Sequence, residues 1–309
     1  MQPSLLLLIL FSLLGSPLLA EDPANETKPS LDSRLQKDRS EYNRVIASYK
    51  PTKPGNITDL EISAEDILKS LPGVMSVERT AIGNNISKRI IHLRDWHFVS
   101  ESDFAKDLRS KETLSDAQIS SLYAAFLLEV ELVQVQQQAI LELLRRHHGL
   151  DHVCIEGLTE KDVDLYRLKL SGLRKSGEKI SELQKLKDDL DATEDQVLIG
   201  QIDAAAADYR LERLQAGAAG QLYVSGHVTD IRPSEKLAEY QAANPLKTRS
   251  VDIDEKAIER RQTAIVSVAT SKIVSFIILG GGHDLSDNLP PNVEYLRVTT
   301  GYYREFSGD

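Results

Sequence analysis

Residues 274–284 read Val-Ser-Phe-Ile-Ile-Leu-Gly-Gly-Gly-His-Asp, and this stretch decides the fold class. A short apolar run that ends at glycines is typical of a buried strand in a parallel sheet. The glycines let the backbone turn sharply and approach another group closely, because no Cβ stands in the way. His283 and Asp284 follow where that strand would end. In open α/β sheets ligands bind at this carboxyl edge, so both side chains are candidates for a site.

Three earlier segments repeat the pattern of an apolar run followed by a histidine or a glutamate. In chain order they are residues 89–93 with Asp95 and His97, residues 152–155 with Glu156, and residues 221–224 with His227. A fifth run, residues 293–298, has no such follower. Because helical segments separate the runs, we predict an α/β fold with a mostly parallel or mixed central sheet and flanking helices.

The intervals between the runs carry helical periodicity and capping residues. Ser115 and Gln118 form the capping box of a long helix that should end at Gly149. Residues 159–217 are highly charged and contain no proline, which indicates two helices in an inserted hairpin. The sequence leaves open whether this hairpin is an arm, a dimer contact or a lid over the sheet edge.

We divide the chain into three parts: residues 1–20, residues 21–58 and residues 59–309. Residues 1–20 carry no charge, and Ala20 precedes a polar stretch, as at the cleavage site of a signal peptide. We expect residues 21–58 to form a polar leader with a first helix, and residues 59–309 to form one α/β domain. Export to the periplasm or the extracellular space follows, with no stable membrane span after signal removal; an uncleaved N-terminal anchor is the alternative.

Charge and cysteine content exclude some partners. The formal net charge is −10, which argues against a nucleic-acid partner. Cys154 is the only cysteine, so no internal disulfide can form, and its apolar surroundings favour a buried, inert thiol. A peptide or a small molecule is the expected ligand, and the oligomeric state is not indicated.

The residues after the runs have the chemistry of a hydrolytic metal centre. His97, His283 and Glu156, with His227 as a weaker member, would bind a divalent metal that activates water, and Glu156 could instead be the general base. Asp95 and Asp284 would orient the histidine rings. Arg261, on the apolar side of a predicted helix over residues 254–271, would neutralise a carboxylate or an oxyanion. The alternative is structural: histidines that pack or cap, and a glutamate and an arginine in one ion pair.

A resemblance to a known family rests on four of these positions. Gly280-Gly281-Gly282-His283 resembles the second Gly-x-x-His motif of the TraB/Tiki proteins and their relatives, the ChaN-type haem-binding proteins and the erythromycin esterases. His97, Glu156 in Glu-Gly, and Arg261 (or Arg260) match the remaining positions of that pattern. The resemblance spans roughly residues 89–289, and it departs from the pattern at Arg94, which stands where the first motif has glycine.

The resemblance implies a two-halved α/β sheet with its site between the halves, and three functions remain open. The first is a metal-dependent hydrolase, a peptidase or an esterase. The second is a protein that binds haem or another small ligand without turnover, with a histidine or with Tyr302 or Tyr303 as axial ligand. The third is a non-catalytic interaction protein that uses the helical hairpin. A serine hydrolase is disfavoured, because no Gly-x-Ser-x-Gly elbow is present.

Overall fold

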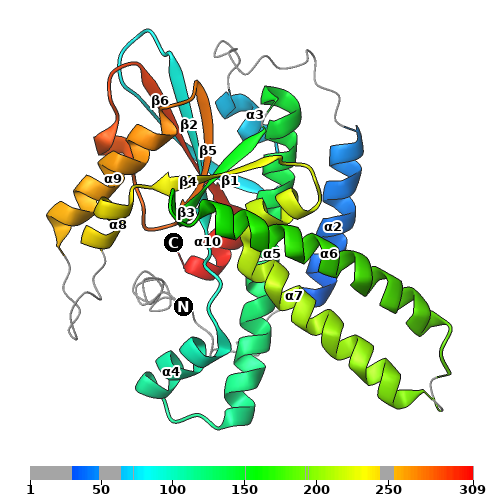
Figure 1. Cartoon of the computed structure of the whole chain (residues 1–309). Coiled ribbons are helices and arrows are strands. Elements are labelled where there is room, and N and C mark those ends of the chain that lie inside the picture. Colours follow the sequence, from blue (N-terminus) through cyan, green and yellow to red (C-terminus); the bar gives the residue numbers. More distant parts are fainter. Residues whose placement is uncertain are drawn as a thin grey trace, which may run out of the picture.

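One six-stranded sheet organises the chain (Figure 1). The computed structural model describes residues 30–48, 64–71, 73–149, 151–191, 193, 195–243 and 254–308. The strand order is β1-β6-β2-β5-β3-β4. The strands are β1 Val74–Ala81, β2 Lys88–Asp95, β3 His152–Thr159, β4 Asp230–Glu235, β5 Val274–Gly280 and β6 Val293–Thr300. The predicted signal peptide, residues 1–20, lies outside the described residues.

The sheet is mixed and mostly parallel, as predicted. β6, β2, β5, β3 and β4 run parallel to one another, and only β1 pairs antiparallel, with β6. The predicted runs 89–93, 152–155, 274–279 and 293–298 lie within β2, β3, β5 and β6. Because β2, β5 and β3 are parallel neighbours, their carboxyl ends meet at one edge of the sheet.

Residues 221–224 do not form the strand that the sequence predicted. They are the last turn of helix α7 (Gln196–Val224), and the strand that follows is β4. A short apolar run cannot be distinguished from a buried helical turn by periodicity alone. Here the run follows Ala218 and Ala219, which favour a helix, and α7 resumes at this point after a break at Gly217 (φ 65°, ψ 178°).

Both edge strands lack the apolar run that marked the inner strands. β1 alternates partly buried and exposed residues, and β4 reads Asp-Ile-Arg-Pro-Ser-Glu with Pro233 in its middle. Proline is tolerated in an edge strand because its missing N–H costs no ladder hydrogen bond on the open side. The composition of these two strands therefore reflects their place at the sheet edges.

Helices cover both faces of the sheet. They are α2 Leu31–Ser48, α3 Ala64–Ser70, α4 Glu101–Lys111, α5 Asp116–His148, α6 Val163–Asp188, α7, α8 Leu237–Ala242, α9 Glu255–Ala269 and α10 Gly301–Ser307. The predicted capping box of Ser115 and Gln118 is present, and α5 ends at Gly149 in a left-handed conformation (φ 63°). Because glycine adopts this conformation without a steric penalty, it ends the helix where the sequence predicted.

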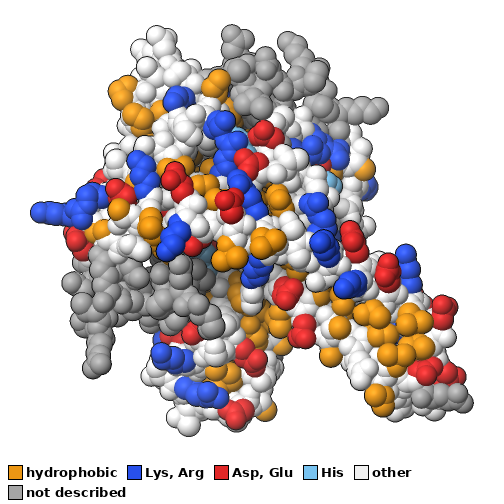
Figure 2. All heavy atoms as spheres, in the orientation of Figure 1, with side chains coloured by type: hydrophobic (Ala, Val, Ile, Leu, Met, Phe, Trp, Pro, Cys, Tyr) orange, Lys and Arg blue, Asp and Glu red, His pale blue; other side chains and the backbone are white. Residues whose placement is uncertain are grey.

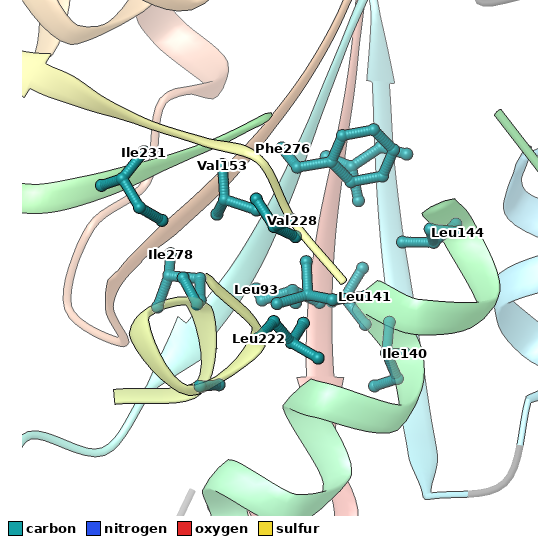
Figure 3. Packing of buried hydrophobic residues seen from close by; sticks show 14 of the residues in the cluster. Leu93, Ile140, Leu141, Leu144, Val153, Leu222, Val228, Ile231, Phe276 and Ile278 are labelled. Carbon is teal, nitrogen blue, oxygen red and sulfur yellow. The ribbon is translucent and has the colours of Figure 1, made fainter. Parts of the chain in front are cut away.

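Two apolar layers follow from the alternation of side chains along the strands. Ile90 and Ile277 point to the face covered by α9. Their neighbours Ile91 and Ile278 point to the opposite face, where α5, α6 and α7 pack. Figure 3 shows part of this second layer, in which Leu93, Phe276 and Ile278 of the strands meet Ile140, Leu141 and Leu144 of α5 and Leu222 of α7.

The predicted helical hairpin is formed by α6 and α7 and extends away from the sheet (Figure 1). Its base belongs to the core, because Leu170, Leu173 and Leu222 are buried in the layer over the sheet. The hairpin therefore extends to Val224 rather than ending near residue 217. Only its outer half is a projection.

Candidate functional site

Five segments bring ionisable side chains together at the carboxyl edge of the sheet. Asp95 ends β2 and His97 follows it, Glu156 lies in β3, and His283 follows β5. Helix α9 contributes Arg261, and the end of β4 contributes Glu235. Of the residues that the sequence singled out, Asp95, His97, Glu156, Arg261 and His283 are thus in one cluster.

Glu156 is the centre of this cluster. Its Oε1 accepts a hydrogen bond from Arg261 (3.0 Å) and lies 2.9 Å from Nε2 of His283. Its Oε2 accepts the backbone N–H of Gly280 (2.5 Å) and lies 3.4 Å from Nε2 of His97. One carboxylate therefore has partners from β2, β5 and α9, and its side chain is only 11% exposed.

Two glycines make this approach possible. A Cβ on Gly280 would lie 2.5 Å from Nε2 of His97 and 3.2 Å from Oε2 of Glu156, so no larger residue fits between them. Gly157 has φ 73°, and the pairing of β3 with β4 shifts register between Ile155 and Thr159. Such an irregularity interrupts the ladder at Glu156 and directs its side chain toward the histidines.

Arg261 is fixed by two carboxylates. Its Nε lies 3.1 Å from both carboxylate oxygens of Glu235, and its second contact is Glu156. Glu235 is fully buried, and the guanidinium carbon of Arg261 stacks 5.2 Å from the ring centre of Tyr240. Arg261 therefore positions Glu156 through these ion pairs.

His97 lies between two carboxylates. Its Nδ1 is 3.1 Å from Asp95, and its Nε2 faces Glu156. Gln137 donates to the other oxygen of Asp95 (3.0 Å) and so fixes that carboxylate. Burial alone would lower the pKa of His97, but the two carboxylates raise that pKa to about 10. Because an ionised carboxylate only accepts hydrogen bonds, both ring nitrogens carry protons and His97 is an imidazolium at neutral pH.

The charge of Glu156 is stabilised in turn. Burial alone would raise the pKa of Glu156, but the charge and hydrogen bond of His283, with those of His97, hold it well below its ordinary value. The ionised carboxylate requires a proton on Nε2 of His283. Nδ1 of His283 is then the ring nitrogen outside this contact.

Two predicted members lie elsewhere. His227 follows the last turn of α7, is half exposed, and has its Nδ1 3.6 Å from Glu142. Its expected position depended on the strand over residues 221–224, which is helical. Asp284 is also half exposed; its carboxylate accepts the N–H of Ser286 (2.9 Å) and lies 3.7 Å from Arg297. Asp284 therefore contacts the loop that follows it and Arg297.

Arg94, which stands at the glycine position of the first motif, supports the second motif. Its guanidinium donates to the carbonyl of Gly281 (3.1 Å) and lies 4.4 Å from the ring centre of Tyr303. Arg297 donates to the same carbonyl (2.7 Å). Two arginines therefore fix the backbone of the loop over residues 280–282 at Gly281.

Tyr302 and Tyr303, the candidate axial ligands of a haem, are both buried. The hydroxyl of Tyr302 donates to Asp38, and the hydroxyl of Tyr303 accepts from Arg94. Tyr303 also fills the space beside Gly281, where a Cβ would lie 1.5 Å from the tyrosine oxygen. Both side chains are thus engaged in packing and hydrogen bonding within the fold.

Sequence reasoning missed Glu235 and His92. Glu235 was hidden because its polar strand was not recognised. His92 lies inside β2 and is fully buried, with Nδ1 2.7 Å from the hydroxyl of Tyr295. Burial lowers the pKa of His92 to about 3, so this histidine is neutral. Its alternation with Ile91 and Leu93 in an apolar run was the available signal of an inward-facing residue.

The donor set does not fit a divalent metal as it is arranged. Among the described residues, no group of three or more His, Cys, Asp or Glu side chains has the geometry of a metal site. The imidazoles of His97 and His283 contact the oxygens of Glu156 directly, and the guanidinium of Arg261 is 3.0 Å from Oε1. These contacts occupy the carboxylate positions that a metal ion would need. The metal expected from the sequence stays a prediction, and the chemistry derived below rests on the side chains alone.

Comparisons with protein-family models, with curated proteins and with solved structures found no match to this chain. Within the described part of the chain, α5 alone is long and apolar enough to cross a membrane by length and composition. Of its most apolar window, 44% is buried inside the protein, and a core helix passes the same test.

Proposed function

We propose that the cluster around Glu156 is a hydrolytic site that cleaves an ester or amide bond by general acid–base catalysis. One observation carries this proposal: a single carboxylate, 11% exposed, lies within 3.4 Å of ring nitrogens of two histidines at the ligand-binding edge of a parallel sheet. His97 has acceptors at both ring nitrogens, whereas His283 faces a carboxylate only through Nε2. Pairs of titratable groups with opposite environments are typical of acid–base sites.

The roles follow from these contacts. Nδ1 of His283 would accept a proton from water as the water attacks a carbonyl carbon, while Glu156 stabilises the imidazolium that forms. His283 would then give this proton to the leaving group as the carbon–leaving group bond breaks, and the positive charge of His97 would stabilise the developing oxyanion. Asp95 and Arg261 position these groups. The side chains of His97 and Asp95 are 16% and 20% exposed, so a substrate would approach from their side.

The test is an activity screen with matched histidine variants. The purified protein would be assayed on chromogenic esters and quenched-fluorescent peptides, together with His283→Asn, His97→Gln and Glu156→Gln. Each should lose at least about a hundredfold in rate, since general acid–base groups contribute that much. His227→Gln is the control and should keep full activity, because His227 lies outside the cluster. Equal activity of all four variants would refute the proposal.

Metal content and colour separate the remaining functions. Elemental analysis and a visible spectrum would be measured on the same purified protein. A stoichiometric transition metal whose removal abolishes activity would favour the metal-dependent hydrolase that the sequence predicts. A Soret band lost in His97 or His283 variants would favour haem binding. Activity that survives chelation supports the acid–base site proposed above.

A specific observation also favours an interaction role for the hairpin. Leu186, Val197 and Leu198, near the free end of α6 and α7, are 46%, 77% and 38% exposed. Figure 2 shows hydrophobic side chains gathered at this end. Apolar side chains grouped on a projection are common at protein–protein contacts. Replacing Val197 and Leu198 by serine should leave hydrolysis unchanged and reduce any self-association seen by light scattering.

A further inference from the structure

A cavity of about 560 Å³ lies apart from the Glu156 cluster, between α2 and the hairpin. Helices α2, α5, α6 and α7 line it. This volume falls in the range of small-molecule sites, about 300–1,000 Å³. We call it the α2–hairpin cavity. Its lining combines an apolar part, including Leu35, Ile180 and Tyr209, with a charged part.

The charged part of the lining has a surplus of positive charge. Arg39, Arg210 and Arg213 line the cavity, against only two carboxylates, Asp32 and Glu131. Arg39 and Arg210 both bind Glu131, whose side chain is 9% exposed. Two cations thus share one buried carboxylate, and one positive charge in the lining remains uncompensated.

Arg213 is held in place by a neutral partner. Its guanidinium donates to Oε1 of Gln221 (2.8 Å). The amide nitrogen of Gln221 donates to Gln134 (2.7 Å), whose own amide nitrogen donates to the carbonyl of Leu214 (2.9 Å). Because Gln134 and Gln221 are buried and fully oriented by this chain, Oε1 of Gln221 must face Arg213.

We propose that the α2–hairpin cavity binds an amphipathic monoanion, a small molecule with one carboxylate on an apolar body. The carboxylate binds Arg213, whose planar guanidinium matches it with two parallel hydrogen bonds. The apolar body lies against Leu35 and Ile180. Because the lining carries one surplus positive charge, we expect the ligand to carry one negative charge. This site is independent of the proposed hydrolysis.

Calorimetric titration with three ligands of equal chain length tests the charge requirement. Decanoate carries the expected charge, decan-1-ol is neutral and decylammonium has the opposite charge. Decanoate should bind at one site per chain, at least about tenfold more tightly than either analogue, and its affinity should fall as salt is raised. Equal affinity for decanoate and decan-1-ol would overturn the proposal.

Three variants place the site. Arg213→Gln should weaken decanoate binding at least about tenfold, because it removes a charge-assisted hydrogen bond. Arg109→Gln, at an exposed arginine of α4, is the matched control and should bind as the wild type does. Ser181→Trp fills the cavity from α6 without changing any charge and should also abolish binding. Circular dichroism confirms that each variant is folded.

The outcomes are separate from those of the hydrolysis assay. Glu156→Gln should bind decanoate with unchanged affinity, since Glu156 lies at the sheet edge. Decanoate binding that persists in both Arg213→Gln and Ser181→Trp would refute the cavity site. Binding that disappears in both variants and persists in Glu156→Gln would support it, whatever the activity screen finds.

Discussion

Glu156 at the sheet edge and Glu131 in the α2–hairpin cavity are both buried carboxylates with more than one basic partner. They differ in the exposure of those partners. His97, Arg261 and His283, the partners of Glu156, are 16%, 11% and 5% exposed. Arg39 and Arg210, the partners of Glu131, are 44% and 45% exposed. The partners of Glu156 are therefore held in fixed positions, whereas the arginines that bind Glu131 can change their contacts.

The difference has a physical consequence for what each region can do. At the sheet edge, none of the charges can reach water easily, so each keeps its partner and its protonation state. In the cavity, the arginines can exchange Glu131 for solvent or for a ligand at little cost. The first arrangement suits catalysis, which needs fixed groups, and the second suits binding of an anion.

The largest effect should come from removing one charge at each carboxylate. Glu156→Gln leaves His97 and Arg261 without their shared counter-charge, and we expect a loss of about 3–5 kcal/mol in the free energy of unfolding. Glu131→Gln should cost about 1 kcal/mol or less, because its arginines can turn to solvent. Urea denaturation measures both. Similar losses in the two variants would show that exposure does not distinguish the two regions.

The pH dependence of stability should reveal the His97 imidazolium. Its pKa of about 10 in the folded protein exceeds the unfolded value of about 6.5. Between these values the folded state holds the proton that the unfolded state has lost. The stabilisation by His97 is therefore complete below about pH 6.5 and falls at about 1.4 kcal/mol per pH unit as pH rises toward 10.

The measurement is the difference in unfolding free energy between the wild type and His97→Gln at several pH values. Taking the difference cancels the groups that titrate alike in both proteins. The difference should be largest at about pH 6.5 and shrink as pH rises toward 10. A difference that stays constant over this range would mean that His97 is not charged in the folded protein.

A smaller effect is expected where a methyl group is added beside Glu156. Gly280→Ala places a Cβ 2.5 Å from Nε2 of His97, so one of the two must move. We expect a loss of roughly 1–3 kcal/mol and a strong loss of hydrolysis. Gly172→Ala, in α6 with no atom within 4 Å of the added Cβ, should instead gain roughly 0.5–1 kcal/mol. Thermal unfolding compares them directly.

The inner strands could be predicted from the sequence and the edge strands could not. Residues 89–93 and 274–279 are mostly apolar and are buried throughout because both faces of β2 and β5 are covered. β1 and β4 are covered less and pair on one side only, so their composition resembles that of loops. The apolar run 221–224 misled for the converse reason, because a buried helical turn is equally apolar.

Site residues could likewise be predicted only where they follow a strand that the sequence reveals. His97, Glu156 and His283 follow recognisable strands, so their convergence could be predicted from the order of the parallel sheet. Glu235 belongs to an unrecognised edge strand, and its contact with Arg261 depends on how α9 packs. His227 was expected in the cluster only because a helical turn was interpreted as a strand. Side-chain partners set by tertiary packing leave no local pattern in a sequence.

The smallest predicted effect separates two aspartates to which the sequence assigned one role. Asp95→Asn replaces a carboxylate that lies 3.1 Å from Nδ1 of His97, so the pKa of His97 should fall. Asp284→Asn changes a half-exposed side chain whose contact with Ser286 an asparagine oxygen can retain. It should change the unfolding free energy by less than about 0.5 kcal/mol and leave hydrolysis intact. Titration of His97 by NMR in both variants makes the comparison. A fall in its pKa in Asp284→Asn as large as in Asp95→Asn would mean that Asp284 also acts on the cluster, and that the carboxyl edge of the sheet is electrostatically coupled beyond its direct contacts.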